Sequence, residues 1–514
     1  MVFLWYIYLL IPLLFRVMTL QGAMPVFFFR KQSNAQVIRF DHLYRKYIGK
    51  MSANPNRIIR DLTTGNVTWT MITFATPLFL SSLLQTVYNV TDMIIVGRYI
   101  GKEGLGAVSI GTDILHFLCF IAMGFSNAGQ VIISQLIGAG MHERVRRTIG
   151  TLFTFLGAGA ILISVAGLIF LDNMLDWVNT PPEAREYTRS YLGICLSGMI
   201  FIYGYNIISA ILRGMGDSRH PFIFVAVSVV INVVLDVLFV VRFKWALYGV
   251  ALATVISQAV SFLWALIFLY RNRAHFGFYF TLKEFSVSRE ALRPLLKLGI
   301  PMVIQSAAIS FSMLFVNSYI NTYGVVATAM TGIGNKLSSI VNIVNIALSA
   351  AGSTMIGQCI GAEKYGRVPQ VLKVSFSING AIALAAGVVT VLFPQTVFGI
   401  FTTDADVLKM SVSYIPVLIL LFGGGALRPP MISLINGSGN FKLNLAVALL
   451  DGVFMRICLS MLLGLAVGYG VYGFWYGHAL AGFTPFVIGI CYFLSGKWRT
   501  RKYIIGRSSI KNAG

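Results

Sequence analysis

The stretch Gln135-Leu136-Ile137-Gly138-Ala139 returns 223 positions later as Gln358-Cys359-Ile360-Gly361-Ala362. A second stretch, Arg213-Gly214-Met215-Gly216-Asp217, returns at the same interval as Asn436-Gly437-Ser438-Gly439-Asn440. The pairs Gly101 and Gly324, and Tyr191 and Tyr414, have this spacing too. Because separate segments keep one offset, the chain is interpreted as a tandem duplication.

The composition points to a lipid environment. Hydrophobic residues make up 57% of the 514 residues and charged residues 11%, and the mean hydropathy is +0.77. Such a chain has too little polar surface to remain monomeric in water. We therefore expect an integral membrane protein.

Twelve apolar stretches are long enough to span a bilayer, for which a helix needs about 20 residues. They lack the alternating polar and apolar pattern of a membrane barrel strand, so helices are predicted. The stretches lie near residues 68–97, 107–136, 147–171, 187–211, 220–241, 248–270, 293–320, 327–358, 370–399, 409–435, 443–466 and 471–494.

Six spans per copy is an even number, so both copies enter the membrane in the same orientation. The predicted fold is therefore all-α, with two parallel six-helix lobes around a central cavity, an arrangement typical of transporters. The expected organisation is an N-terminal extension at 1–55, a first lobe at 56–275, a cytoplasmic linker at 276–292, a second lobe at 293–496 and a basic cytoplasmic tail at 497–514.

The net charge of +22 is distributed unevenly between the two sides of the membrane. Loops after even-numbered spans hold fifteen Lys or Arg residues, whereas the opposite loops hold seven. The positive-inside rule then places both termini in the cytoplasm, with the protein in a bacterial plasma membrane. The basic tail fits that side, where anionic lipid attracts it. No aromatic-basic module accompanies the charge, so nucleic-acid binding is not expected.

Motifs for metal, redox or nucleotide chemistry are missing from the sequence. The five cysteines fall within predicted spans without paired spacing. His142-Glu143 lacks the second histidine of a zinc protease motif, because Arg146 stands there. There is no phosphate-binding loop of the G-x-x-x-x-G-K-[ST] type. We expect no enzyme activity, metal or cofactor, and uphill transport would need an ion gradient.

The first fifty residues have two interpretations. Met1 to Phe15 is apolar but shorter than a span, and no clear cleavage pattern follows it. Met51 is the better start, which would make the preceding residues a start-site artefact or a dispensable extension. The alternative is a segment that lies on the membrane surface.

Acidic residues inside the spans are the main candidates for function, because a charge at bilayer depth costs at least about 2 kcal/mol. Asp92 in the first span and Asp236 in the fifth both lie in the outer half at about 1.5 Å per residue. Asn232 precedes Asp236 by four positions and shares its helical face. Thr254, two turns into the sixth span, lies on the outer side as well.

Two carboxyls, a carboxamide and hydroxyls can hold a proton or a small hard cation such as Na+, because neighbouring carboxylates repel each other until a positive charge is bound. The equivalents of Asp92, Asn232 and Asp236 in the second copy are Phe315, Met455 and Leu459. The predicted ion site thus belongs to the first lobe alone. The alternative is that both acids are neutral residues that tie helices together.

Four further charged residues have open interpretations. Asp113 lies near the outer end of the second span and is either interfacial or part of the cavity. Asp451 and Arg456 are five apart in the eleventh span, and Arg428 precedes two prolines in the tenth. These three form either a structural charge cluster or a cavity group that selects substrate charge.

Three segments make the sequence resemble the multidrug and toxic compound extrusion (MATE) family. They are the stretches 85–92, followed by Val96-Gly97, 212–217 and 232–236, which read QTVYNVTD, LRGMGD and NVVLD. The resemblance covers about residues 55–500. Together the segments are fairly specific, although each alone would be a weak signal.

The sequence looks most similar to the DinF-like branch of that family, in which the acids lie in the N-terminal lobe. This resemblance implies that Asp92 and Asp236 bind the coupling H+ or Na+, with Asn232 and Thr254 completing the network. Tyr191 and Gln85 would border it. The other bacterial branch uses acids in the seventh and tenth spans, and residues 293–320 and 409–435 contain none.

The family likeness implies antiport, in which an organic, often cationic and amphipathic compound leaves while an ion enters. We expect small-molecule substrates, contact with membrane lipid and a monomer. A flippase of lipid-linked sugars would favour a basic cavity and would not need the acid pair. A dedicated metabolite exporter would keep the acids. A membrane enzyme is the least favoured class.

Overall fold

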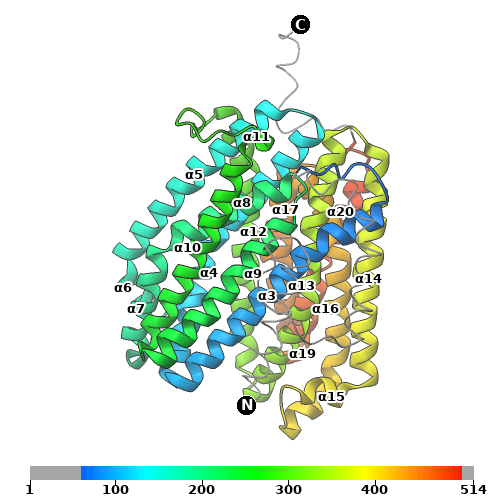
Figure 1. Ribbon diagram of the computed structural model, residues 1–514. Helices are drawn as coiled ribbons and strands as arrows, with labels where there is room; N and C mark the ends of the chain where they lie inside the picture. The colour runs from blue at the N-terminus through cyan, green and yellow to red at the C-terminus, as the bar shows by residue number, and fades with distance from the viewer. Residues whose placement is uncertain (1–58, 500–514) are drawn as a thin grey trace, which may run out of the picture. The chain divides into compact units, whose positions relative to one another are not determined.

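The computed structural model describes residues 59–499, and every regular element in that part of the chain is a helix. Helix labels follow Figure 1 and begin at α3. The predicted extension at 1–55 and nearly all of the predicted tail at 497–514 lie outside the described residues.

The first half of the described chain runs from α3 to α10, and α11 follows it. Its elements are α3 (Val67–Tyr99), α4 (Lys102–Gly138), α5 (His142–Ile169), α6 (Leu171–Trp177), α7 (Pro182–Ser197), α8 (Met199–Gly214), α9 (Arg219–Asp236), the π-helix η2 (Val237–Arg242), α10 (Ala246–Arg271) and the short α11 (Arg273–Phe276).

The second half runs from α12 to α20. Its elements are α12 (Arg289–Asn321), α13 (Val325–Gly361), the 3₁₀ turn η3 (Tyr365–Arg367), α14 (Val368–Leu392), α15 (Pro394–Gly399), α16 (Ala405–Gly437), α17 (Phe441–Leu449), η4 (Leu450–Met455), α18 (Arg456–Met461), η5 (Leu462–Ala466), α19 (Gly470–Ala481) and α20 (Thr484–Leu494), with η4 and η5 being π-helices.

The helix boundaries repeat at the interval found in the sequence. Helices α4 and α13 are both 37 residues long. Each is preceded by a glycine with positive φ, 92° at Gly101 and 97° at Gly324, a conformation that only glycine adopts readily. The repeated glycines therefore mark a repeated turn between the first two long helices of each half.

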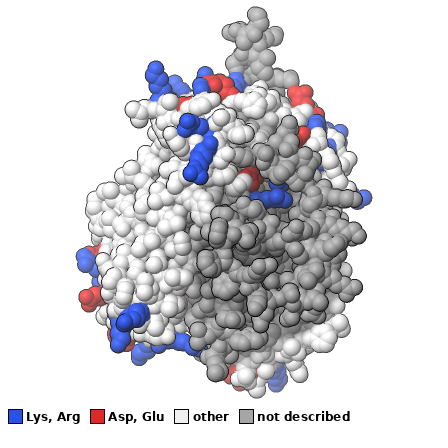
Figure 2. All heavy atoms as spheres, in the orientation of Figure 1, with Lys and Arg blue, Asp and Glu red and all other residues white. Residues whose placement is uncertain are grey.

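The number of spans agrees with the prediction. Eleven helices in the described part are long and apolar enough to cross a membrane, and the count reaches twelve if the bent pair α7 and α8 forms one span. Figure 1 shows these long helices side by side. On the left of the face in Figure 2, charged side chains lie mainly toward the upper and lower ends, with uncharged residues between them. The prediction of an all-helical membrane protein is confirmed.

The fourth span differs from the single helix expected at 187–211. Helices α7 and α8 meet at Gly198 with a bend of 48°. A Cβ at Gly198 would lie 2.7 Å from a side-chain methyl of Val255 in α10, so the bend brings α10 close to the backbone. The corresponding helix of the second half, α16, continues without a break past the position equivalent to Gly198.

The two halves contact each other mainly through α4. This helix packs against α12 and α13 of the second half, while α3 packs against α13 and α14. Residues of α3, among them Val67, Met71 and Phe74, join an apolar cluster made mostly of second-half residues. The later part of α3 instead faces α9 and α10 of its own half, where the predicted acids lie.

Candidate ion site in the first half

Asp92 and Asp236 come together inside the first half. Asp92 lies on α3, and Asp236 is the last residue of α9, where the helix changes to the π-helix η2. The side chains are 6% and 0% exposed, and their carboxyl groups are close enough to interact directly. A π-helical turn often accompanies a functional site because it redirects the side chains around it.

Asn232 lies one turn before Asp236 and is 1% exposed. Both atoms of its carboxamide, both carboxyl oxygens of Asp236 and Oδ1 of Asp92 lack a conventional hydrogen-bond partner within residues 59–499. Buried polar atoms are nearly always satisfied in folded proteins. A proton shared by the carboxyls, or a small cation held by these oxygens, would satisfy the oxygen atoms of the group.

Tyr88 is a member of this site that the sequence reasoning did not single out. Its hydroxyl lies 3.2 Å from Oγ1 of Thr254 on α10 and also interacts with Asp92, four residues later on the same helix. Thr254 is therefore connected to the acids through Tyr88. The spacing of four residues was a readable signal, because it places two side chains on one helical face, but tyrosines are abundant in this chain.

The other predicted neighbours differ in their surroundings. Tyr191 on α7 is buried near Asp92 and interacts with Thr112 of α4, so Thr112 is a second residue not singled out from the sequence. Gln85 on α3 and Asp113 on α4 are exposed. The structure thus gathers Tyr191, but not the side chains of Gln85 and Asp113, into the buried part of the site.

Asp451 forms a separate cluster in the second half. Its carboxylate lies 3.0 Å from Nη2 of Arg428 and 3.1 Å from Nη2 of Arg456. Arg456 also lies 3.4 Å from the ring nitrogens of His478 on α19. Asp451 is completely buried, whereas Arg428 keeps 25% of its side chain exposed. One carboxylate is thus shared by two guanidinium groups.

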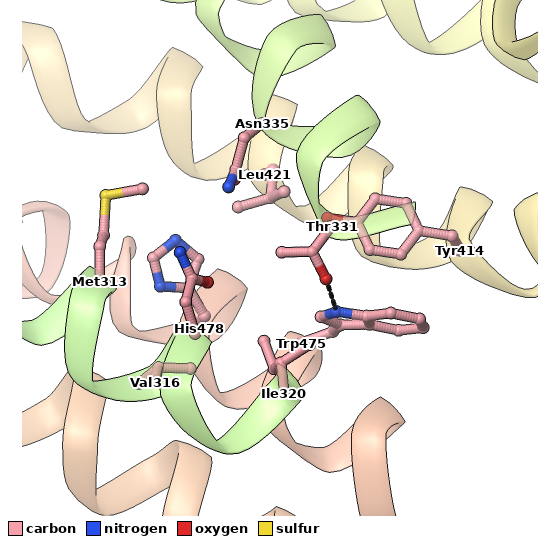
Figure 3. A pocket seen from close by; sticks show the side chains of 10 residues that line it. Met313, Val316, Ile320, Thr331, Asn335, Tyr414, Leu421, Trp475 and His478 are labelled. Carbon is pink, nitrogen blue, oxygen red and sulfur yellow. Dashed lines mark hydrogen bonds between the residues drawn. The ribbon is translucent and has the colours of Figure 1, made fainter. Parts of the chain in front are cut away.

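A small cavity occupies the second half at the level equivalent to the acid pair. Figure 3 shows Asn335, Tyr414 and His478 around it, and Trp475 Nε1 donates a hydrogen bond to Oγ1 of Thr331 at 2.8 Å. Tyr414 and Asn335 are the counterparts of Tyr191 and Thr112 at the 223-residue interval. The second half therefore has polar residues around this cavity, while its equivalents of Asp92 and Asp236 are the apolar Phe315 and Leu459.

The described residues offer little for conventional metal or disulfide chemistry. Within residues 59–499 there is no group of three or more His, Cys, Asp or Glu side chains that could hold a metal ion. All five cysteines are free in this part of the chain. The oxygen-rich group around Asp92 and Asp236 is suited instead to a proton or to a hard monovalent cation.

The fold and the buried acid pair define the class as a membrane transporter built from two copies of one helical unit. The model of the MatE family matches residues 77–238 and 301–462, which are more than half of the chain and reproduce its duplication. The chain therefore belongs to the MatE family, the multidrug and toxic compound extrusion transporters, and not to a class of enzymes.

Curated relatives agree with this assignment. The chain is 32% identical over 361 residues to the probable multidrug resistance protein YoeA of Bacillus subtilis, covering 69% of this chain and 78% of that protein. It is 26% identical to the probable multidrug resistance protein YpnP of the same organism, covering 86% of this chain and 98% of that protein.

Solved structures have the same fold. A crystal structure of MATE in complex with MaD3S superposes with a TM-score of 0.78 at 22% identity, over 86% of this chain and 99% of that one. An outward-facing multidrug resistance MATE transporter of the MOP superfamily gives a TM-score of 0.77 at 23% identity, over 85% and 97% of the two chains.

Proposed function

We propose that this chain is a secondary active antiporter that exports organic, cationic and amphipathic compounds in exchange for H+ or Na+. The observation that carries the proposal is the acid pair of Asp92 and Asp236, buried together without an ion-pair partner within residues 59–499. Names of relatives that refer to multidrug resistance and export support the substrate class.

The proposed coupling of ion and substrate movement depends on the charge of the acid pair. When the pair carries negative charge, it attracts a cationic substrate held in the expected central cavity between the lobes. Binding of H+ or Na+ removes that negative charge and weakens the attraction. Because ion and substrate favour different states of the same site, their movements in opposite directions become coupled.

Each polar neighbour has a specific role in this proposal. Asn232 supplies a carboxamide oxygen to a bound cation or a hydrogen bond to a protonated acid. Tyr88 holds Asp92 and transmits its state to Thr254 on α10. Tyr191 closes the site on the α7 side. Gln85 and Asp113 are exposed, so we place them on the path by which ions reach the site and not in the site itself.

We further propose membership of the DinF-like branch, since the buried acids without an arginine partner lie in the first half. The expected lobe boundaries, the cytoplasmic position of both termini and a monomeric state are part of the same proposal. We assign the cluster of Asp451, Arg428 and Arg456 to the cavity wall, where the partly exposed Arg428 would influence which substrate charges are accepted.

The decisive experiment is efflux of a fluorescent organic cation from proteoliposomes under an imposed H+ or Na+ gradient. Asp236→Asn and Asp92→Asn should reduce gradient-driven efflux to the level of protein-free vesicles, because neither variant can exchange a charge at that position. Tyr88→Phe should slow it by about two- to tenfold, the loss of one hydrogen bond.

The matched control is Glu186→Gln, which removes an exposed carboxylate from α7 of the same half and should leave efflux close to normal. All variants must keep the melting temperature of a folded protein. Gradient-driven efflux that survives in Asp236→Asn would refute the assignment.

A further inference from the structure

Four helices end together at the side of the molecule that carries the basic loops. These are α4 and α8 of the first half and α13 and α16 of the second. Gly138 and Gly361 bring α4 and α13 into direct backbone contact, because a Cβ at either would lie 2.1 Å from the carbonyl oxygen of Gln358 or Gln135. We call this crossing the seal.

Two glutamines at the repeat interval connect the halves across the seal. Gln135 Nε2 donates to the carbonyl oxygen of Gly437 at 2.7 Å, and Gln358 Nε2 donates to that of Gly214 at 3.4 Å. In a third connection, Arg213 Nε donates to Oε1 of Gln130 at 2.8 Å, and Gln130 Nε2 donates to Oγ1 of Thr354 at 2.7 Å. All these groups lie where the two halves would have to separate for this side to open.

The segment before α3 contacts one of these two glutamines, Gln358. Residues 61–64, which we call the strap, precede a first-half helix but bind the second half. The backbone N–H of Leu62 donates to Oε1 of Gln358 at 2.9 Å. Leu62 is 3% exposed and packs in the apolar cluster of second-half residues.

Two basic side chains after α13 hold the rest of the strap. Lys364 Nζ donates to Oγ1 of Thr63 at 2.7 Å, and Arg367 Nη2 donates to the carbonyl oxygen of Thr64 at 2.7 Å. Asp61 folds the strap into a tight turn, because its Oδ1 accepts from the backbone N–H of Thr63 at 2.7 Å and from the Thr63 hydroxyl at 2.6 Å.

We propose that the strap is a latch that holds the seal closed through Gln358, and that it must release Lys364 and Gln358 whenever this side of the transporter opens. The strap occupies the carboxamide oxygen of Gln358 and thereby orients its Nε2 toward Gly214 of the opposite half. The equivalent segment before α12 likewise crosses to the opposite half, where Ser288 N–H donates to Thr151 on α5 at 3.1 Å and Glu284 lies 3.6 Å from Arg146. In that segment the backbone bond runs to Thr151 rather than to Gln135, so the contact with a glutamine of the seal belongs to the strap.

Opening of the seal can be measured without substrate or ion gradient. Ser134 is completely buried at the crossing with Gly357, so a Ser134→Cys reporter reacts with a maleimide only when the seal opens. The five native cysteines are first replaced by alanine, and the labelling rate is measured on the purified full-length protein in detergent.

The double variant Thr63→Val, Lys364→Met removes the ammonium-to-hydroxyl contact and should raise the labelling rate by about 10- to 150-fold, the range for loss of a charged hydrogen bond. Gln358→Ala should raise it at least as much. Thr86→Val is the matched control, because among residues 59–499 the Thr86 hydroxyl bonds only a carbonyl of its own helix, that of Ser82 at 3.0 Å. Labelling of this variant should stay at the parent rate.

An unchanged labelling rate in the strap variant, in a protein that melts like the parent, would overturn the proposal. So would a lower melting temperature without faster labelling, because the strap would then stabilise the fold without governing the seal. Since labelling needs neither transport nor a bound ion, failure of the antiport assignment would leave this result unaffected.

Discussion

At the scale of single residues, Asp61 shows how one carboxylate shapes the strap. Burial raises the pKa of Asp61, but hydrogen bonds from the hydroxyl and N–H of Thr63, together with the nearby Lys364 ammonium, outweigh burial and leave the pKa lower than usual. A lowered pKa in the folded chain means that the ionised carboxylate stabilises the fold above the unfolded pKa of about 3.9. That contribution is lost as the pH falls through the folded pKa.

A pH series on Asp61→Asn checks this direction. The parent should melt at a higher temperature than Asp61→Asn between pH 6 and 8, with a constant difference. The difference should shrink below about pH 4, where the carboxylate of the parent becomes protonated and resembles the carboxamide. Thermal unfolding of the two purified proteins provides the measurement, and a difference that grows with acidity would contradict the interpretation.

The role of Tyr88 could not be predicted from the sequence. Asp92, Asn232 and Asp236 could be selected from the sequence because polar groups are rare and costly inside a span. Tyr88 could not be distinguished in this way, because the chain has 22 tyrosines and 38 phenylalanines. Only its contact with Thr254 of α10 identifies its role.

At the scale of helices, the glycines at the seal have a packing function that other helix glycines lack. Gly138→Ala would place a methyl group 2.1 Å from a backbone oxygen of α13, and a backbone atom cannot move aside alone. We expect a cost of about 1–3 kcal/mol and a lower melting temperature. The variant should also label faster at a Ser134→Cys reporter.

Gly157→Ala is the comparison for this prediction. Gly157 is inside α5, and an added Cβ would meet no atom within 4 Å. Alanine should be neutral there, or stabilising by up to about 1 kcal/mol, because it favours the helix. If both variants melt at the same temperature, close packing at Gly138 does not limit the approach of the two halves.

The helices also show where sequence periodicity was insufficient. The span predicted at 187–211 is two helices bent at Gly198, whereas its copy α16 continues despite Pro416, Pro429 and Pro430. Local sequence favours a break in α16 rather than in the first half. The packing of α10 against Gly198 decides the outcome, and a neighbour's position cannot be read from a helix's own residues.

At the scale of the whole molecule, the distribution of basic residues predicts one orientation in the membrane. Trp177 after the third span is 74% exposed, and Leu282 in the segment between the halves is 93% exposed. In a cysteine-free background, Trp177→Cys should react with a membrane-impermeant maleimide on intact cells. Leu282→Cys should react only after the cells are permeabilised. The reverse pattern would place the basic loops outside.

The amino-acid sequence by itself determined the membrane environment, the duplication, the number of spans and the confinement of the acid pair to one copy. Each of these depends on composition, on spacing along the chain or on the cost of a charge in lipid, and such properties are local. Tertiary structure alone decided which groups meet: Tyr88 with Thr254, Asp451 with two arginines, and Leu62 with Gln358 across 296 positions. Contacts between distant segments depend on how whole helices pack, because packing and not local preference sets the distance between their side chains.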